Sequence, residues 1–103
     1  MDLKLITRHL DRRQSLIDLA HRRASFAFAR FSALVRGIEI RLSDVNGPRG
    51  GQGILCLARV RLVHGGEVMV ETASSSPEDG IEQSIARLTN RVRRLVSRQH
   101  DRR

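Results

Sequence analysis

Four arginines near the end of the chain have the spacing of one helix face. Arg87, Arg91, Arg94 and Arg98 follow one another at intervals of three or four residues, and at about 100° per residue they fall on a single line. Like charges at this spacing destabilise an isolated helix by roughly a few tenths of a kcal/mol per pair. Guanidinium groups, however, form paired hydrogen bonds with phosphate oxygens. The line therefore favours a phosphate-binding surface; the alternative is a solvated face whose cations complement the helix dipole.

A second basic group lies in the first third of the chain. Arg22, Arg23 and Arg30 share one flank of a predicted helix with Leu19 and Phe26. Two helices packed side by side on one sheet would join both basic flanks. RNA double helices present phosphates and 2′-hydroxyls rather than readable base edges, and only 3% of the residues are aromatic, which argues against base stacking. The pattern predicts shape-led binding of structured RNA with weak sequence specificity.

Basic residues are concentrated at the two ends of the sequence. The 103 residues carry a formal net charge of +8. Residues 1–36 contain eight basic and three acidic residues, residues 83–103 contain seven and one, and the segment between them contains four and seven. Each phosphate that such a surface neutralises releases condensed counterions and adds salt-sensitive affinity. The charge distribution therefore indicates a polyanionic partner.

The residue pattern shows no sign of catalysis or metal binding. The one cysteine, Cys56, allows no internal disulfide and provides too few thiols for a zinc site, and the four histidines lack metal-ligand spacing. No apolar run approaches the roughly 18 residues of a membrane span. We expect a cytoplasmic protein with one domain spanning residues 1–103, without membrane contact, cofactor, metal, small-molecule substrate or enzymatic activity.

Hydrophobic periodicity predicts the elements that position these arginines. Alternation of apolar and polar residues predicts strands at about 2–7, 38–43, 54–64 and 67–72, with Cys56 on the buried side of the third and a tight turn at His64-Gly65-Gly66. A helix is predicted from about 12 to 35, ended by Gly37, with a stripe formed by Leu16, Ala20, Ala24, Ala27, Phe31 and Leu34.

The start of the last helix has the strongest local signal. Ser76 is a suitable N-cap, Pro77 follows at the first helical position, and Asp79 lies three residues after the cap. The helix can run to about residue 97. The resulting order, β-α-β-β-β-α, predicts an α+β two-layer sandwich with a four-stranded mixed sheet and both helices on one face. The first two strands should be parallel, joined by a right-handed crossover.

A glycine-rich segment, residues 46–53, joins the second and third strands. It lacks the Gly-Lys-Ser/Thr ending of a P-loop and connects two strands rather than opening a helix. Its glycines and proline indicate a turn. Its amides could also bind an anion with the help of Arg49, which we include among the candidate RNA-binding residues.

The segment 41–51, Arg-Leu-Ser-Asp-Val-Asn-Gly-Pro-Arg-Gly-Gly, followed by Cys56 in the next strand, resembles the signature of ribosome hibernation promoting factors and the ribosome-associated inhibitor. Residues 6–10 are similar to the family's opening, and residues 81–94 are similar to its basic final helix. The resemblance extends over almost the whole chain and implies a fold similar to double-stranded RNA-binding domains.

The resemblance also implies a partner and a mechanism. Members of this bacterial family occupy the channel between the head and body of the small ribosomal subunit, contact ribosomal RNA through basic helices, and keep ribosomes idle in stationary phase or stress by steric occlusion. Arg87, Arg91 and Arg94 match the basic stretch of the family's last helix. Arg22, Arg23 and Arg30 correspond to the charge of its first helix by position.

A departure from the family leaves alternatives open. Ile54 and Leu55 stand where charged residues commonly precede the cysteine, and this apolar pair would suit a divergent paralogue that self-associates. The chain also resembles the short type, without the C-terminal extension of the long forms, and we expect a monomer or weak homodimer. A different class of protein is a non-ribosomal interaction module, whose exposed sheet face would pair Arg41, Arg59 and Arg61 with Glu39, Glu67 and Glu71.

Overall fold

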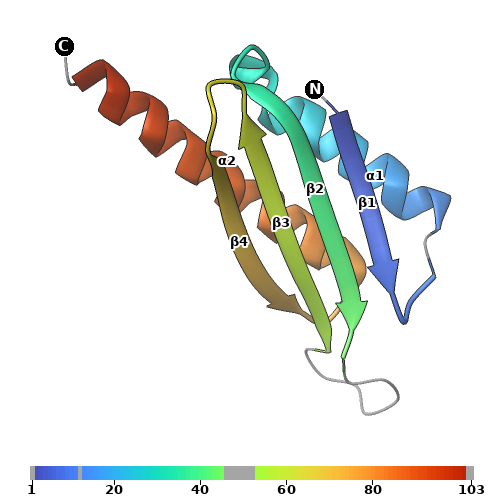
Figure 1. The fold of residues 1–103 in the computed structure, drawn as a ribbon. Coiled ribbons are helices and arrows are strands. Elements are labelled where there is room, and N and C mark those ends of the chain that lie inside the picture. Colours follow the sequence, from blue (N-terminus) through green and yellow to red (C-terminus); the bar gives the residue numbers. More distant parts are fainter. Residues whose placement is uncertain (1, 12, 46–52, 102–103) are drawn as a thin grey trace.

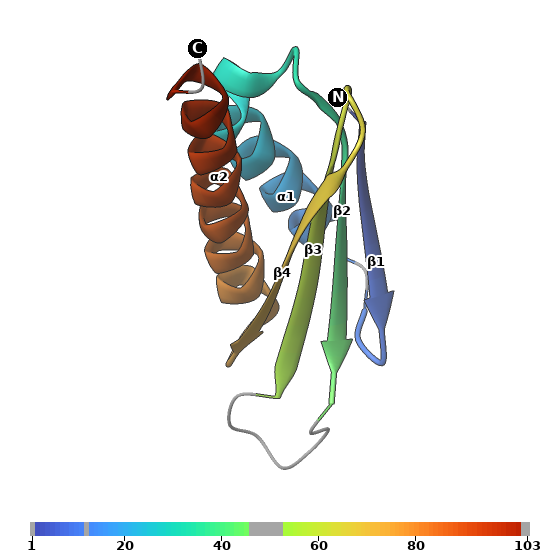
Figure 2. The same cartoon turned by 60° about the vertical axis from the view of Figure 1, so that its left-hand side comes forward.

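The computed structural model describes residues 2–11, 13–45 and 53–101. A four-stranded sheet is covered on one face by two helices (Figures 1 and 2). In chain order the elements are β1 (Asp2–Arg8), α1 (Gln14–Ala27), the 3₁₀ helix η1 (Ala29–Phe31), β2 (Val35–Asp44), β3 (Ile54–Leu62), β4 (Glu67–Ser74) and α2 (Pro77–Asp101).

The sheet has the order β1-β2-β3-β4. β1 is parallel to β2, and the other two pairs are antiparallel. The predicted β-α-β-β-β-α order and the two-layer α+β architecture with a mixed sheet are therefore confirmed. Because β1 and β2 are parallel, the chain must cross over one face of the sheet between them, and α1 lies in that crossover on the same face as α2 (Figure 2).

The core lies between the sheet and the helices. In β4, and in β3 up to Val60, every second residue is buried, as the alternation predicted, and Cys56, Ala58 and Val60 of β3 are fully covered. In β1 only Leu5 is buried. The helices contribute stripes at three- and four-residue spacing, which are Leu16, Ala20 and Ala24 on α1 and Ile81, Ile85, Leu88 and Val92 on α2.

The first helix is shorter than predicted. α1 ends at Ala27, and Phe28 (φ −102°, ψ 12°) leaves the helical conformation. The next turns close by tighter bonds, from the Phe31 amide to the Phe28 carbonyl (2.9 Å) and from the Leu34 amide to the Phe31 carbonyl (2.8 Å). Phe28, which is fully buried, takes the core position predicted for Ala27. Phe28 continues the spacing of Leu16, Ala20 and Ala24, whereas Ala27 is only partly buried against the core.

Gly37 has a different role from the predicted one. It lies within β2, opposite Asp2 of β1 and next to a register shift at Val35, rather than ending the helix. A Cβ atom at this position would lie 3.4 Å from the Asp2 carbonyl oxygen, which is an ordinary van der Waals distance, so the spacing of the two strands does not by itself require glycine. Because the helix ends early, β2 begins at Val35 instead of about residue 38.

Both turn signals of the C-terminal half are confirmed. Gly65 (φ 92°) and Gly66 (φ 86°) form the turn between β3 and β4. The Asp79 amide donates to Ser76 Oγ (3.1 Å), so Ser76 caps α2 and Pro77 begins it. The helix runs to Asp101, beyond the predicted end, and its last turns extend past the sheet (Figure 1).

Two neighbouring phenylalanines provide a test of this packing. Replacing the fully buried Phe28 by alanine (F28A) should lower the free energy of unfolding by about 3–5 kcal/mol, because it removes a ring from the core. The same change at the exposed Phe26 (F26A) should alter it by less than about 0.5 kcal/mol. Urea unfolding measures both, and equal effects would contradict the helix break at Phe28.

Candidate RNA-binding surface

Two of the four arginines on the predicted line bind the edge of the sheet. Arg87 Nη1 donates to the carbonyl oxygen of Glu71 (2.6 Å) and to Oγ1 of Thr72 (3.0 Å). Arg91 Nη1 donates to the carbonyl oxygen of Met69 (3.1 Å). In an antiparallel edge strand the carbonyls of alternate residues point away from the sheet. Arg87 and Arg91 therefore cover exposed backbone groups of β4, in addition to carrying positive charge.

The other two arginines of the line point outward from the C-terminal half of α2. Arg94 and Arg98 are exposed, and within the described part of the chain no hydrogen bond or ion pair holds them. With Arg91 they line a groove of about 390 Å³ between α2 and β4, whose other walls include Glu67 and Met69. Guanidinium groups on a groove open to solvent can contact a phosphate backbone without breaking any interaction within the protein.

The free energy of unfolding tests whether Arg87 and Arg91 contribute to the fold while Arg94 and Arg98 do not. Replacing Arg87 and Arg91 together by alanine (R87A/R91A) should lower the free energy of unfolding by about 1–2 kcal/mol, because the double variant lacks the hydrogen bonds to β4. Replacing Arg94 and Arg98 (R94A/R98A) should change it by less than about 0.5 kcal/mol. Denaturant unfolding compares the two, and a larger destabilisation in R94A/R98A would contradict the assignment.

The candidate arginines of the first half of the chain are exposed as well. Arg23 Nη2 forms an ion pair with Glu82 Oε1 of α2 (2.7 Å) and so bridges the two helices. Arg30 belongs to η1 rather than to α1, and its guanidinium carbon lies 5.6 Å from the centroid of the Phe31 ring. Arg22 is exposed, and no contact within the described residues restrains its guanidinium group.

The two basic groups lie on opposite flanks of α2. Arg87 and Arg91 reach β4, whereas the α2 residues that line a groove with Phe26 and Arg30 are Ala86, Thr89 and Asn90. On α2 the lining of this groove consists of neutral residues, so the two basic groups face different neighbours of the helix. Arg93 lies on the α1-facing flank, where its Nη2 donates to Asn90 Oδ1 (2.9 Å). Sequence analysis missed it because it falls off the predicted line.

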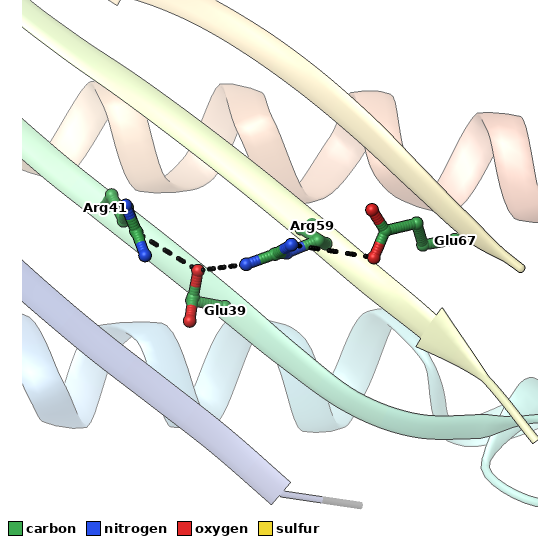
Figure 3. Close-up of polar contacts among 4 residues, drawn as sticks. All are labelled: Glu39, Arg41, Arg59 and Glu67. Atoms are coloured by element: carbon green, nitrogen blue, oxygen red, sulfur yellow. Dashed lines mark hydrogen bonds and ion pairs between the residues drawn. The ribbon is translucent and has the colours of Figure 1, made fainter.

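The open face of the sheet carries a balanced network of charges (Figure 3). Glu39 Oε2 accepts hydrogen bonds from Arg59 Nη2 (2.7 Å) and Arg41 Nε (3.1 Å), and Arg59 Nη1 lies 3.6 Å from Glu67 Oε2. The hydrogen bond from Arg59 is the main cause that lowers the pKa of Glu39 below its ordinary value of 4.5. Burial acts in the opposite direction, and the charges of Arg41 and Arg59 lower the pKa further. These pairings leave this face much less basic than the helical layer.

The lowered pKa of Glu39 predicts a dependence of stability on pH. The ionised carboxylate is favoured in the folded state, so its contribution is fully present above pH 4.5 and is lost as pH falls from there through the folded pKa. Replacing Glu39 by glutamine (E39Q) should destabilise the protein at pH 7 and cost less below pH 4. The measurement is chemical unfolding across this range, with Arg59→Gln expected to show the same trend. If E39Q lowered the free energy of unfolding by the same amount at every pH, the stabilising role of the ionised Glu39 carboxylate would be contradicted.

The remaining candidates are a buried cysteine, the glycine-rich segment and possible metal ligands. Cys56 is buried, as predicted, and burial raises the pKa of its thiol, which disfavours the reactive thiolate. The described residues contain no group of three or more His, Cys, Asp and Glu side chains that could hold a metal ion. Arg49 and the rest of segment 46–52 lie outside the described residues. None of the described helices combines the length and the apolar character that a membrane crossing needs.

Comparison with solved structures decides the fold. The chain is similar to the N-terminal domain of protein Y from Thermus thermophilus, with a TM-score of 0.75, 23% sequence identity, and coverage of 92% of this chain and 99% of that domain. It is also similar to a ribosomal subunit interface protein from Coxiella burnetii, with a TM-score of 0.76, 14% identity, and coverage of 94% and 99%. The chain has the fold of these two proteins.

This likeness confirms, for the fold, the resemblance indicated by segment 41–51. By sequence alone, no model of a protein family and no curated protein matches the chain. At these identities the protein Y fold provides the scaffold, and the function must be argued from the surface.

Proposed function

We propose that this protein binds the small ribosomal subunit in the bacterial cytoplasm and inhibits translation by occupying the decoding channel, with its basic helices against ribosomal RNA. The observation that carries the proposal is the charge of α2, which contains five arginines and no acidic residue between Gln83 and Arg98. One protein of the same fold is described as a ribosomal subunit interface protein, which supports a ribosomal partner.

The contrast between the two faces of the molecule supports contact through the helices. On the sheet, Arg41 and Arg59 are paired with Glu39 and Glu67, so a phosphate backbone would have to displace internal ion pairs. On the helical layer, Arg94, Arg98 and Arg22 are exposed and can meet phosphates at once. Such contacts release counterions, and their free energy falls steeply with salt.

The mechanism is steric. A rigid two-layer body with arginines on its helices can fill an RNA-lined channel and exclude other ligands without forming or breaking a bond. It needs no cofactor, membrane or small-molecule substrate, and we propose no enzymatic activity. The double-stranded character of most ribosomal RNA suits an interface of guanidinium groups, which read phosphate spacing rather than base identity.

Co-sedimentation with purified small subunits tests this function. Wild-type protein should comigrate stoichiometrically at physiological salt, and replacing Arg94 and Arg98 by glutamate (R94E/R98E) should abolish comigration. This pair is chosen because it leaves the Arg87 and Arg91 contacts with β4 intact. For each phosphate that a variant no longer neutralises, the slope of log affinity against log salt should also become shallower by about 1.

The matched control for R94E/R98E reverses two arginines on the strands, so the change in net charge is the same. Arg8 and Arg36 are exposed strand residues, and R8E/R36E should still comigrate with the subunit. Failure of the wild type to comigrate would refute the ribosomal proposal, and equal weakening in both double variants would refute contact through the helices.

A second candidate function is self-association through the sheet. The open face has a hollow of about 510 Å³ that Ile6, Leu55 and Leu57 line together with Arg41 and Glu71. Apolar side chains in such a hollow could bind a second copy, and a contact of this kind would respond weakly to salt. Sedimentation velocity of the free protein distinguishes the two functions, because only the self-associating form gives a dimer that persists at high salt.

A further inference from the structure

Phe26 is an aromatic side chain that the fold does not use. It lies one residue before the end of α1, and 86% of its surface is exposed, whereas Phe28 is fully buried and Phe31 nearly so. A phenyl ring left in water gives up the free energy of burial. Arg22 is its neighbour four residues before on the surface of α1, and Arg30 of η1 lines the same groove as Phe26.

The ring borders a groove between the two helical segments. The groove measures about 440 Å³, and its lining includes Phe26, Ala27 and Arg30 on one side and Ala86 and Asn90 of α2 on the other. The small side chains of Ala27 and Ala86 are part of its lining, and the Phe26 ring is largely exposed to solvent. The Oδ1 of Asn90 accepts a hydrogen bond from Arg93 Nη2.

The charges around the groove favour a nucleic acid over an apolar protein surface. Arg22 is exposed without a restraining contact in the described residues, and Arg30 is exposed on the same flank as the groove. An apolar partner would have to desolvate these guanidinium groups, whereas a nucleotide offers a planar base for the ring and a phosphate for each arginine. Paired RNA buries its base faces, so a lone exposed ring would bind an unpaired nucleotide.

We infer that Phe26 stacks on an unpaired base of the bound RNA, while Arg22 and Arg30 contact the phosphates on either side of that nucleotide. The inference rests on the proposed function, and it adds a point of local recognition to an interface otherwise built on charge. It also revises the expectation that base stacking plays no part, because a low aromatic content does not exclude one well-placed ring.

Three substitutions at position 26 separate stacking from apolar contact. F26A and F26L should each weaken binding to purified small subunits by about 5- to 150-fold, since a stacked base contributes about 1–3 kcal/mol. F26W should bind at least as tightly as the wild type. Leucine keeps apolar bulk without a flat face, so wild-type affinity in F26L together with weakened binding in F26A would overturn stacking and indicate an apolar protein contact.

Tryptophan fluorescence gives a direct signal of stacking. The chain has no tryptophan or tyrosine, so F26W reports only on position 26, and A73W on the open sheet face, where Ala73 is exposed, is the control. Small subunits should quench F26W and leave A73W unchanged. Unchanged F26W emission in a formed complex, or wild-type affinity in both F26A and F26L, would overturn the inference and leave the ribosomal function standing.

Stacking by Phe26 can also hold if the proposed ribosomal function is wrong. If wild-type protein does not bind small subunits, the probes become an RNA hairpin with one bulged nucleotide and the fully paired hairpin of the same stem. Quenching of F26W by the bulged hairpin alone would support stacking in a protein with another RNA target. Equal effects of the two hairpins would overturn it.

Discussion

The packing of the α2 stripe against β3 and β4 is the constraint on which the rest of the structure depends. Ile81, Ile85, Leu88 and Val92 are all but fully buried against the sheet, which fixes the rotation of the helix about its own axis. One flank must then face β4 and the other α1. The positions of the arginines follow, because each is placed by its angle from the buried stripe.

The same residue type therefore has two roles on one helix. Arg87 and Arg91 lie close enough to β4 to hydrogen-bond its outward carbonyls, and so protect an edge that could otherwise pair with another strand. Arg94 and Arg98 are farther along α2 and remain exposed. Substitutions that treat the four arginines as equivalent would confuse loss of structure with loss of binding. On the sheet the arginines have a third role, as partners of Glu39 and Glu67.

Much of the fold could be predicted because its signals are local. Period-two alternation, the two glycines of the β3–β4 turn and the Ser76-Pro77 start each depend on a few adjacent residues. The end of α1 could not be predicted in this way. Phe26, Phe28 and Phe31 are chemically alike in the sequence, and only the assembled core determines that Phe28 is buried and Phe26 is not. The helix break and the exposed ring both follow from that choice.

The candidate RNA-binding surface could also be predicted only in part. Periodicity was enough to place Arg87, Arg91, Arg94 and Arg98 on one line, but the hydrogen bonds of the first two depend on where β4 lies. The flank shared by α1 and α2 depends on how the helices pack, so the expected joint surface and the role of Arg93 could not be judged from spacing alone.

Directed cleavage of ribosomal RNA tests the central claim, contact through the helical layer, most directly. Because Cys56 is fully buried, a single introduced cysteine can carry an iron chelate that generates hydroxyl radicals, either at the exposed Ser97 of α2 or at the exposed Ala73 on the open sheet face. With small subunits bound, the probe at position 97 should cleave ribosomal RNA strongly at a few clustered sites, and the probe at position 73 much more weakly. Cleavage from position 73 alone, or from neither position in a sedimenting complex, would contradict the account.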